Sequence, residues 1–247
     1  MAVWLAVALA QTAWGADLQE AEVLYERGAL QEAARLAAEV GGADGLSLAA
    51  KARLVEAIYQ APADAKPGLL DEAAGLAQAA LALDPTHVDA LIDLALTLGH
   101  KADLAGPITA HLNRYATDGK ALLDQALALD PDNAWAHGLL GMWHLQVVRH
   151  ASDGLAAELF GASRATGLEH CARAEALGPQ ELALRYGCAL SLLELDPERY
   201  GQRARQALEM VGRMPARDAA EELVRADAVR LLAELDLKAA RPADPDG

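Results

Sequence analysis

The sequence predicts an all-α fold, an α-solenoid of antiparallel helix pairs with about 9–11 helices. The first observation is a repeat, because residues 81–85 and 127–131 both read Leu-Ala-Leu-Asp-Pro and lie 46 residues apart. A looser copy, Glu-Ala-Leu-Gly-Pro at 175–179, follows 48 residues later. The second observation is that Val, Ile and Thr never cluster into the alternating runs that a strand needs. Ala/Leu-rich runs that stop at a proline and then resume are typical of stacked helix pairs.

The charge of the chain limits its partners. It has 36 acidic and 21 basic residues, a net charge of −15. Binding to nucleic acid or to anionic lipid requires basic surface, so we expect neither. An acidic surface keeps an Ala/Leu-rich solenoid in solution, and it also favours basic partners.

The N-terminus is predicted to be a signal peptide over residues 1–16. Residues 2–16 carry no charged side chain, and the first charged residue of the chain is Asp17. Ala13 and Gly15 are small and two apart, which suits cleavage after Gly15. A basic n-region is missing, so a buried first helix of the solenoid remains the alternative. We therefore expect a bacterial periplasmic or secreted protein with no integral membrane span after cleavage, or a cytoplasmic one if the run is not a signal peptide.

The repeat domain is predicted to cover residues 17–238, followed by a disordered tail at 239–247. A helix–turn–helix unit begins at Asp17 and turns at Gly28. The glycine-rich stretch 41–45 predicts a break before a helix over 46–60. Two prolines within 62–68 end that helix, and the next runs over 69–83 until Asp84-Pro85.

Further helices are predicted beyond the first proline motif, with two insertions among them. Apolar spacing indicates a helix over 86–99, and an unusual segment around 101–116 then lengthens the connection to the helix that ends at 129. The helix after Pro131 is followed by an insertion at 149–166, which contains a short helix at about 155–160. Four helices complete the domain, at about 166–177, 181–195, 199–213 and 216–238.

Small residues surround each proline in the manner of a tetratricopeptide repeat. Ala73, Ala80 and Ala90 flank Pro85, and Ala126, Ala136 and Gly141 flank Pro131 in the same way. Such residues let two helix backbones approach closely. The period of 46–48 residues exceeds the usual ~34 because each unit contains an insertion.

One family combines these features in the same order. The stretches Leu-Leu-Gly-Met-Trp-His-Leu at 139–145, Ala-Glu-Leu-Phe-Gly at 157–161 and Ala-Arg-Ala-Glu-Ala-Leu-Gly-Pro at 172–179 follow one another. In this the chain resembles the tetratricopeptide domain of the regulator of microtubule dynamics family and its bacterial relatives, over about residues 69–235. The resemblance implies a protein-binding scaffold with no catalytic residues to transfer and no cofactor.

Candidate partner-binding residues lie on the first helix of two successive repeats, whose inner face usually lines the groove of such solenoids. After Pro85 they are Asp89, Ile92, Asp93, Leu96 and His100, and after Pro131 they are Trp135, Gly138, Met142, Leu145 and Gln146. Exposed Trp and Met suit an apolar peptide side chain or a partner helix. The alternative for Trp135 is a role in the core between layers.

Cys171 and Cys188 are a candidate disulfide. They lie eight residues before and nine residues after Pro179. Equal distances from the turn of an antiparallel hairpin bring two residues to the same height. We expect the bond if the chain is exported, and two buried thiols if it is cytosolic.

No chemistry-bearing motif is present. His137 and His144 share a helix face, but no HExxH or CxxC pattern accompanies them, so we expect no metal site. The sequence has neither a glycine-rich phosphate loop nor a nucleophile motif, which argues against an enzyme. The leading hypothesis is a non-catalytic scaffold for a peptide or partner helix. The alternatives are a structural subunit of a cell-envelope complex, with possible oligomerisation, and a small-ligand-binding solenoid.

Overall fold

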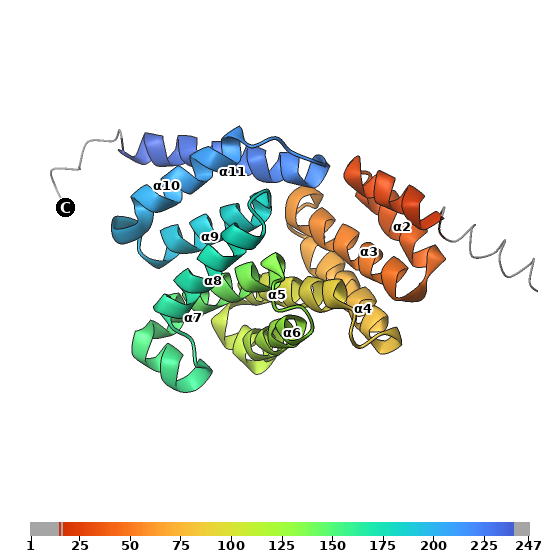
Figure 1. Cartoon of the computed structure of the whole chain (residues 1–247), viewed down its shortest axis with the longest axis horizontal. Helices are drawn as coiled ribbons and strands as arrows, with labels where there is room; N and C mark the ends of the chain where they lie inside the picture. Colours follow the sequence, from red (N-terminus) through yellow and green to blue (C-terminus); the bar gives the residue numbers. More distant parts are fainter. Residues whose placement is uncertain (1–14, 16, 240–247) are drawn as a thin grey trace, which may run out of the picture. The chain divides into compact units, whose positions relative to one another are not determined.

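The computed structural model describes residue 15 and residues 17–239, and every regular element among them is helical (Figure 1). The all-α solenoid prediction is therefore confirmed. In chain order the elements are residues 17–26, α2 (Leu30–Val40), α3 (Gly42–Val55), the π-helical turn η1 (Glu56–Gln60), α4 (Lys66–Leu83), α5 (Val88–Leu112), α6 (Tyr115–Leu129), α7 (Ala134–Phe160), α8 (Arg164–Leu177), α9 (Leu182–Leu195), α10 (Pro197–Arg213) and α11 (Ala219–Ala239).

The chain divides into two compact units. The first extends to Ala136 and the second begins at His137, so the boundary falls within the first turn of α7. Apart from residue 15, the predicted signal peptide lies outside the described residues, and so does the predicted tail beyond residue 239. No helix in the described part of the chain combines the length and the apolar character that a membrane span requires.

Alanine allows the helices of the first unit to pack closely. Neighbouring helices α2, α3 and α4 contact one another in succession (Figure 1). Ala33, Ala37, Ala73 and Ala77 are all fully buried between them. A methyl group fills little space, so the backbones come close enough for tight packing.

The predicted break at 41–45 is wrong beyond its first glycine. Gly41, with φ of 70°, ends α2, but α3 already begins at Gly42. Gly45 lies inside α3 and faces α2, where an added Cβ would be 2.5 Å from the carbonyl oxygen of Ala37. The glycine therefore serves a close approach of two helices, not a loop.

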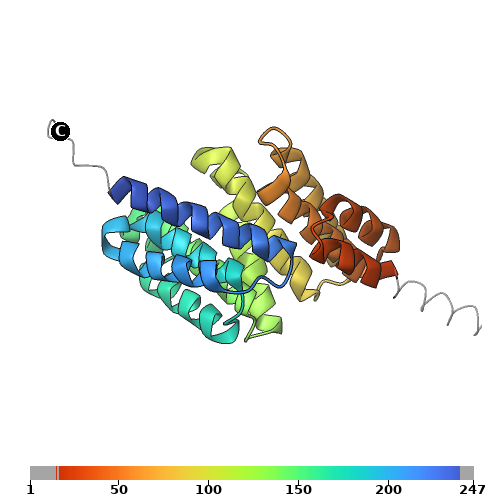
Figure 2. The same cartoon turned by 90° about the horizontal axis from the view of Figure 1, so that it is seen from above.

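The second unit depends on glycine at its centre. A Cβ added to Gly141 of α7 would lie 2.9 Å from the backbone nitrogen of Cys171 and 3.0 Å from the carbonyl oxygen of Gly167, both in α8. The next helices, α9, α10 and α11, lie side by side (Figure 2). Tyr200, Leu208 and Val211 of α10 are buried in this part of the unit.

Both insertions are helical beyond a kink, and the second contains the short helix predicted at about 155–160. The helix predicted to end at residue 99 continues to Leu112, and α7 continues to Phe160. Each long helix bends at one residue with positive φ, Gly106 (φ 74°, ψ 166°) in α5 and Ser152 (φ 66°, ψ 160°) in α7. Gly106 follows Pro85 by 21 residues, and Ser152 follows Pro131 by 21 residues. The bend is thus a feature of the repeat itself.

Candidate partner-binding site

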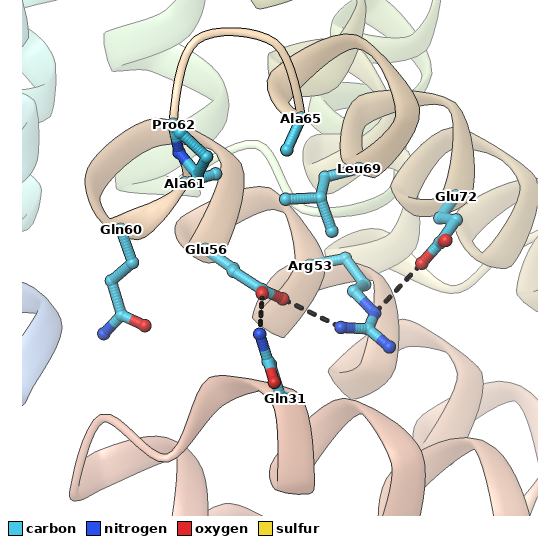
Figure 3. Close-up of a pocket in the computed structure, with 9 residues that line it drawn as sticks. All are labelled: Gln31, Arg53, Glu56, Gln60, Ala61, Pro62, Ala65, Leu69 and Glu72. Atoms are coloured by element: carbon cyan, nitrogen blue, oxygen red, sulfur yellow. Dashed lines mark hydrogen bonds and ion pairs between the residues drawn. The ribbon is translucent and has the colours of Figure 1, made fainter.

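A pocket opens in the first unit where α3 passes into η1 and the chain returns along α4 (Figure 3). Its volume is about 530 Å³. The residues that line it are Gln31, Arg53, Glu56, Gln60, Ala61, Pro62, Ala65, Leu69 and Glu72. The sequence patterns indicate none of them as site residues.

A network of charged and amide groups forms the polar wall of this pocket. The side chain of Glu56 is buried, with 5% of the residue exposed. Gln31 Nε2 donates to Glu56 Oε1 at 2.7 Å, and Arg53 Nη1 donates to Glu56 Oε2 at 2.8 Å (Figure 3). Arg53 Nε lies 3.1 Å from Glu72 Oε2. A buried carboxylate requires such partners, because an unpaired charge away from water is strongly unfavourable.

The π-helical turn gives the pocket its shape. The Ala61 N–H bonds to the carbonyl oxygen of Glu56 at 2.9 Å, five residues back, which widens the last turn of the helix. Lys66 Nζ donates to the carbonyl oxygen of Ile58 at 3.0 Å and so satisfies a backbone acceptor of that turn. Single π-helical turns inside α-helices occur frequently at functional sites.

The opposite wall of the pocket is apolar. Ala61, Pro62, Ala65 and Leu69 form it, and Figure 3 shows Leu69 directed towards the polar network. Glu72 stands at the rim with an exposed side chain. The arrangement can accept a side chain with an apolar stem and a head that donates hydrogen bonds. In the sequence, Arg53, Glu56 and Glu72 look like ordinary charges on helix surfaces, and no pattern marks the π-helical turn.

Of the candidate residues on α5, the structure exposes Asp89 only. Ile92 and Asp93 are buried, and Leu96 and His100 are half-buried. Leu96 packs against the cluster around Leu54. Burial, followed by the charge of Lys66, lowers the pKa of His100 to about 4, so its ring is neutral near pH 7.

Asp93 is the most unusual of these residues. It is 8% exposed, and its Oδ2 atom has no hydrogen-bond partner. Burial raises the pKa of Asp93 to about 7, although the positive charge of Lys51 acts in the opposite direction. The hydroxyl of Thr97 donates to the backbone carbonyl of Asp93 at 2.6 Å and leaves the carboxyl group without that donor.

Of the candidate residues on α7, Trp135 belongs to the first unit, and the other four belong to the second unit. A Cβ added to Gly138 would meet the side chain of Leu184 in α9. A Cβ added to Gly187, also in α9, would meet the sulfur of Met142. Gln146 Nε2 donates to Glu194 Oε2 at 2.5 Å. Leu145 is buried and Trp135 is half-buried. The role of this set in partner binding stays a prediction.

Three histidines of the second unit, His137, His144 and His170, lie together on α7 and α8. The Nδ1 atoms of His137 and His170 lie 2.8 Å apart, and the ring of His144 stacks on that of His170. Among the described residues, no group of three or more His, Cys, Asp or Glu side chains is arranged to hold a metal ion. Cys171 and Cys188 form a disulfide with their Cα atoms 6.1 Å apart.

The structural class of the chain follows from a solved structure with a similar fold. A thermophilic TPR protein from Thermus thermophilus has a similar structure, with a TM-score of 0.60 and 17% identity over 88% of this chain and 99% of the other. This likeness shows the fold, so the chain is an all-α protein of the tetratricopeptide-repeat type. The family model "Regulator of microtubule dynamics protein 1-3" matches residues 17–236. The chain belongs to that family. No curated protein sequence matches the chain.

Proposed function

We propose that the chain is a non-catalytic protein-binding scaffold, and that the pocket beside η1 takes a basic side chain of a peptide or partner helix. The fold and the family support the general role, because folds of this type typically present binding surfaces. The site is supported by the pocket itself, which joins the acidic groups of Glu56 and Glu72 to the apolar wall around Leu69.

Charge favours a basic ligand over an acidic one. The pocket contains two carboxylates, on Glu56 and Glu72, against the single guanidinium of Arg53. The whole chain carries −15, which attracts a basic partner at long range. A Lys or Arg stem packs well on aliphatic side chains while its head reaches carboxylates. Asp89, exposed on α5, adds a further negative charge to the first unit.

A peptide library tests this proposal. We expect the full chain to select peptides that contain Lys or Arg, and to bind them more weakly as salt is raised. Glu72→Lys reverses the charge at the rim and is expected to weaken binding at least about tenfold, the effect of ~1.4 kcal/mol. Glu22→Lys is the matched control, since Glu22 is also an exposed glutamate of the first unit and does not line the pocket.

The proposal would be wrong if no peptide were enriched, or if enriched peptides lacked basic residues. Equal binding by the Glu72→Lys and Glu22→Lys variants would remove the pocket from the proposal. Selection of a small metabolite in place of peptides would favour the small-ligand alternative. Stable co-purification of large envelope assemblies that the Glu72→Lys change leaves intact would favour the structural-subunit alternative.

We also propose that the chain is exported to an oxidising compartment. The uncharged run before Asp17 and the pairing of Cys171 with Cys188 support this. Intact mass of the protein from fractionated cells, without reductant, tests it. We expect loss of residues 1–15 or 1–16 and a mass two hydrogens below that of the dithiol. A full-length, reduced chain in the cytosol would overturn the proposal.

A further inference from the structure

The ends of the two long helices expose aliphatic side chains at matching places. We call residues 104–112, around the bend of α5, the first spur, and residues 150–159, around the bend of α7, the second spur. Ile108 and Leu112 of the first spur are 77% and 75% exposed. Leu155 and Leu159 of the second spur are 52% and 65% exposed. In both spurs the two residues are four apart, so each pair lies on one helical face.

The bends carry these side chains to the surface. Without its bend each helix would continue straight, but the residues Gly106 and Ser152 adopt the same left-handed conformation and redirect the last turns. This region of backbone space is almost restricted to glycine, so serine there is strained. A bend that recurs at the same place in two repeats, once in spite of strain, indicates that the direction of the spur matters to the protein.

The two spurs differ in charge. The first spur contains no Asp, Glu, Lys or Arg, whereas the second contains Asp153 and Glu158. Three charged residues lie beside the first spur: Lys101 pairs with Asp71 at 2.5 Å, Arg114 pairs with Asp118 at 3.2 Å, and Asp103 directly precedes Leu104. The first spur is thus an uncharged aliphatic surface on a chain of net charge −15.

We propose that the first spur is the contact through which two copies of this chain associate, with Ile108 and Leu112 of one copy packed against the same residues of the other. A second copy is equally acidic, so it approaches most easily where neither surface carries charge. A basic partner is attracted instead to the acidic surface outside the first spur. A two-fold contact places the same patch on both sides, and a pair of aliphatic residues four apart is self-complementary in that arrangement.

The size of the patch sets the strength of the contact. Ile108 and Leu112 are joined by the exposed Leu104, which gives three aliphatic side chains in each copy. Stable complexes bury about 1,200 Å² or more in total, which three side chains and their rim do not reach. We therefore expect a reversible dimer with a dissociation constant on the order of 10–100 µM.

Sedimentation velocity of the full chain tests the proposal over about 5–300 µM, a range that brackets the expected affinity. The double variant Ile108→Gln/Leu112→Gln is expected to weaken dimerisation at least tenfold. The matched control is Leu155→Gln/Leu159→Gln, the same change in the second spur, which is expected to leave the dimer unchanged. Raising the salt concentration is expected to strengthen the dimer of the unaltered chain, because salt screens the repulsion between two negative molecules. Both variants change exposed residues, and equal thermal unfolding temperatures would verify that they fold.

Several results would overturn the proposal. One is a monomer at every concentration; another is a dimer that the first-spur variant does not weaken. A dimer that is lost in the second-spur variant but kept in the first-spur variant would place the contact in the second spur. Flotation of the chain with neutral phosphatidylcholine vesicles, lost in the first-spur variant and without dimerisation in solution, would assign the surface to lipid.

Discussion

The helices α5 and α7 occupy the same place in successive repeats, yet their centres are built differently. Eight residues after the proline, α5 has the buried acid Asp93 where α7 has Leu139. Ten residues after it, α5 has Ala95 where α7 has Gly141. Fifteen residues after it, His100 of α5 corresponds to Gln146 of α7. At the first two of these positions α7 has an apolar or a small residue that packs closely, whereas α5 has the ionisable groups of Asp93 and His100, whose pKa values burial shifts.

This difference suggests where each unit can change state. In α7 the small residues Gly138 and Gly141 lie against α8 and α9, and a disulfide joins those two helices. In α5 the groups of Asp93 and His100 have pKa values of about 7 and about 4, shifted in opposite senses by burial. The stability of the first unit should therefore respond to pH, and that of the second to redox conditions.

The largest effect is expected from Asp93→Asn at alkaline pH. The unfolded chain ionises this carboxyl near pH 4, but the folded chain does so only near pH 7. Unfolding thus releases a proton between these values, so the group lowers stability as pH rises through this window and lowers it fully above pH 7. A shift of about three units corresponds to about 4 kcal/mol as an upper value. Asparagine cannot ionise, so we expect the variant to be more stable by about 2–4 kcal/mol at pH 8 in urea titrations.

The same titrations at lower pH provide the control. At pH 3.5 the folded chain holds the Asp93 proton and about two-thirds of unfolded chains also do, so the advantage of the variant should fall to about 0.2 kcal/mol. His100 has the opposite effect on the pH dependence of stability. Its ring is protonated below about pH 6.5 in the unfolded chain but only below about pH 4 in the folded chain, so acidification lowers stability between these values. Between pH 4 and 6.5 the variant should lose stability on acidification more steeply than the unaltered chain. An advantage that does not depend on pH would contradict the assignment to ionisation.

The next effect concerns the disulfide of the second unit. Replacing Cys171 and Cys188 with Ser opens a loop of about 16 residues, which in the chain-entropy model lowers the free energy of unfolding by about 3 kcal/mol. Hydrogen exchange should show the loss of protection in α8 and α9, while α5 and α6 in the first unit serve as the internal reference. Uniform loss across both units would show that the bond does not act locally.

Close packing at Gly141 gives a smaller effect. In Gly141→Ala the new methyl group meets backbone atoms of Cys171 and Gly167, which cannot rotate away, so α7 and α8 must separate. We expect a loss of about 1–3 kcal/mol in urea denaturation. Ala95→Gly, the reciprocal change in α5, should cost about 1 kcal/mol through helix propensity. A Gly141→Ala variant as stable as the unaltered chain would show that α7 and α8 separate without cost.

These comparisons also mark what the sequence can and cannot predict. Proline after Asp84 and Asp130 predicts where α4 and α6 end, and the structure places both helix ends there. The sequence locates both insertions and the short helix of the second, but it predicts no helix in the first and neither kink, because a single residue such as Gly106 or Ser152 leaves no periodic signal. Its pattern groups Asp93 with surface positions, since a helix covered on several sides has no polar face to mark it. The pocket beside η1 depends on one five-residue turn, which has no sequence signal of its own.

The smallest effect distinguishes the two bends. Ser152 adopts a conformation that glycine adopts freely, so Ser152→Gly should raise the free energy of unfolding by about 1 kcal/mol. Gly106→Ser introduces in α5 the residue that α7 already has, and it should lower stability by a similar amount. Nothing lies within 4 Å of a Cβ at Gly106, so backbone strain alone would act there. If both changes left urea denaturation unaltered, the bends would relax without cost and could not hold the direction of either spur. Opposite and nearly equal changes would mean that both repeats maintain the same bend, the first with glycine and the second in spite of strain.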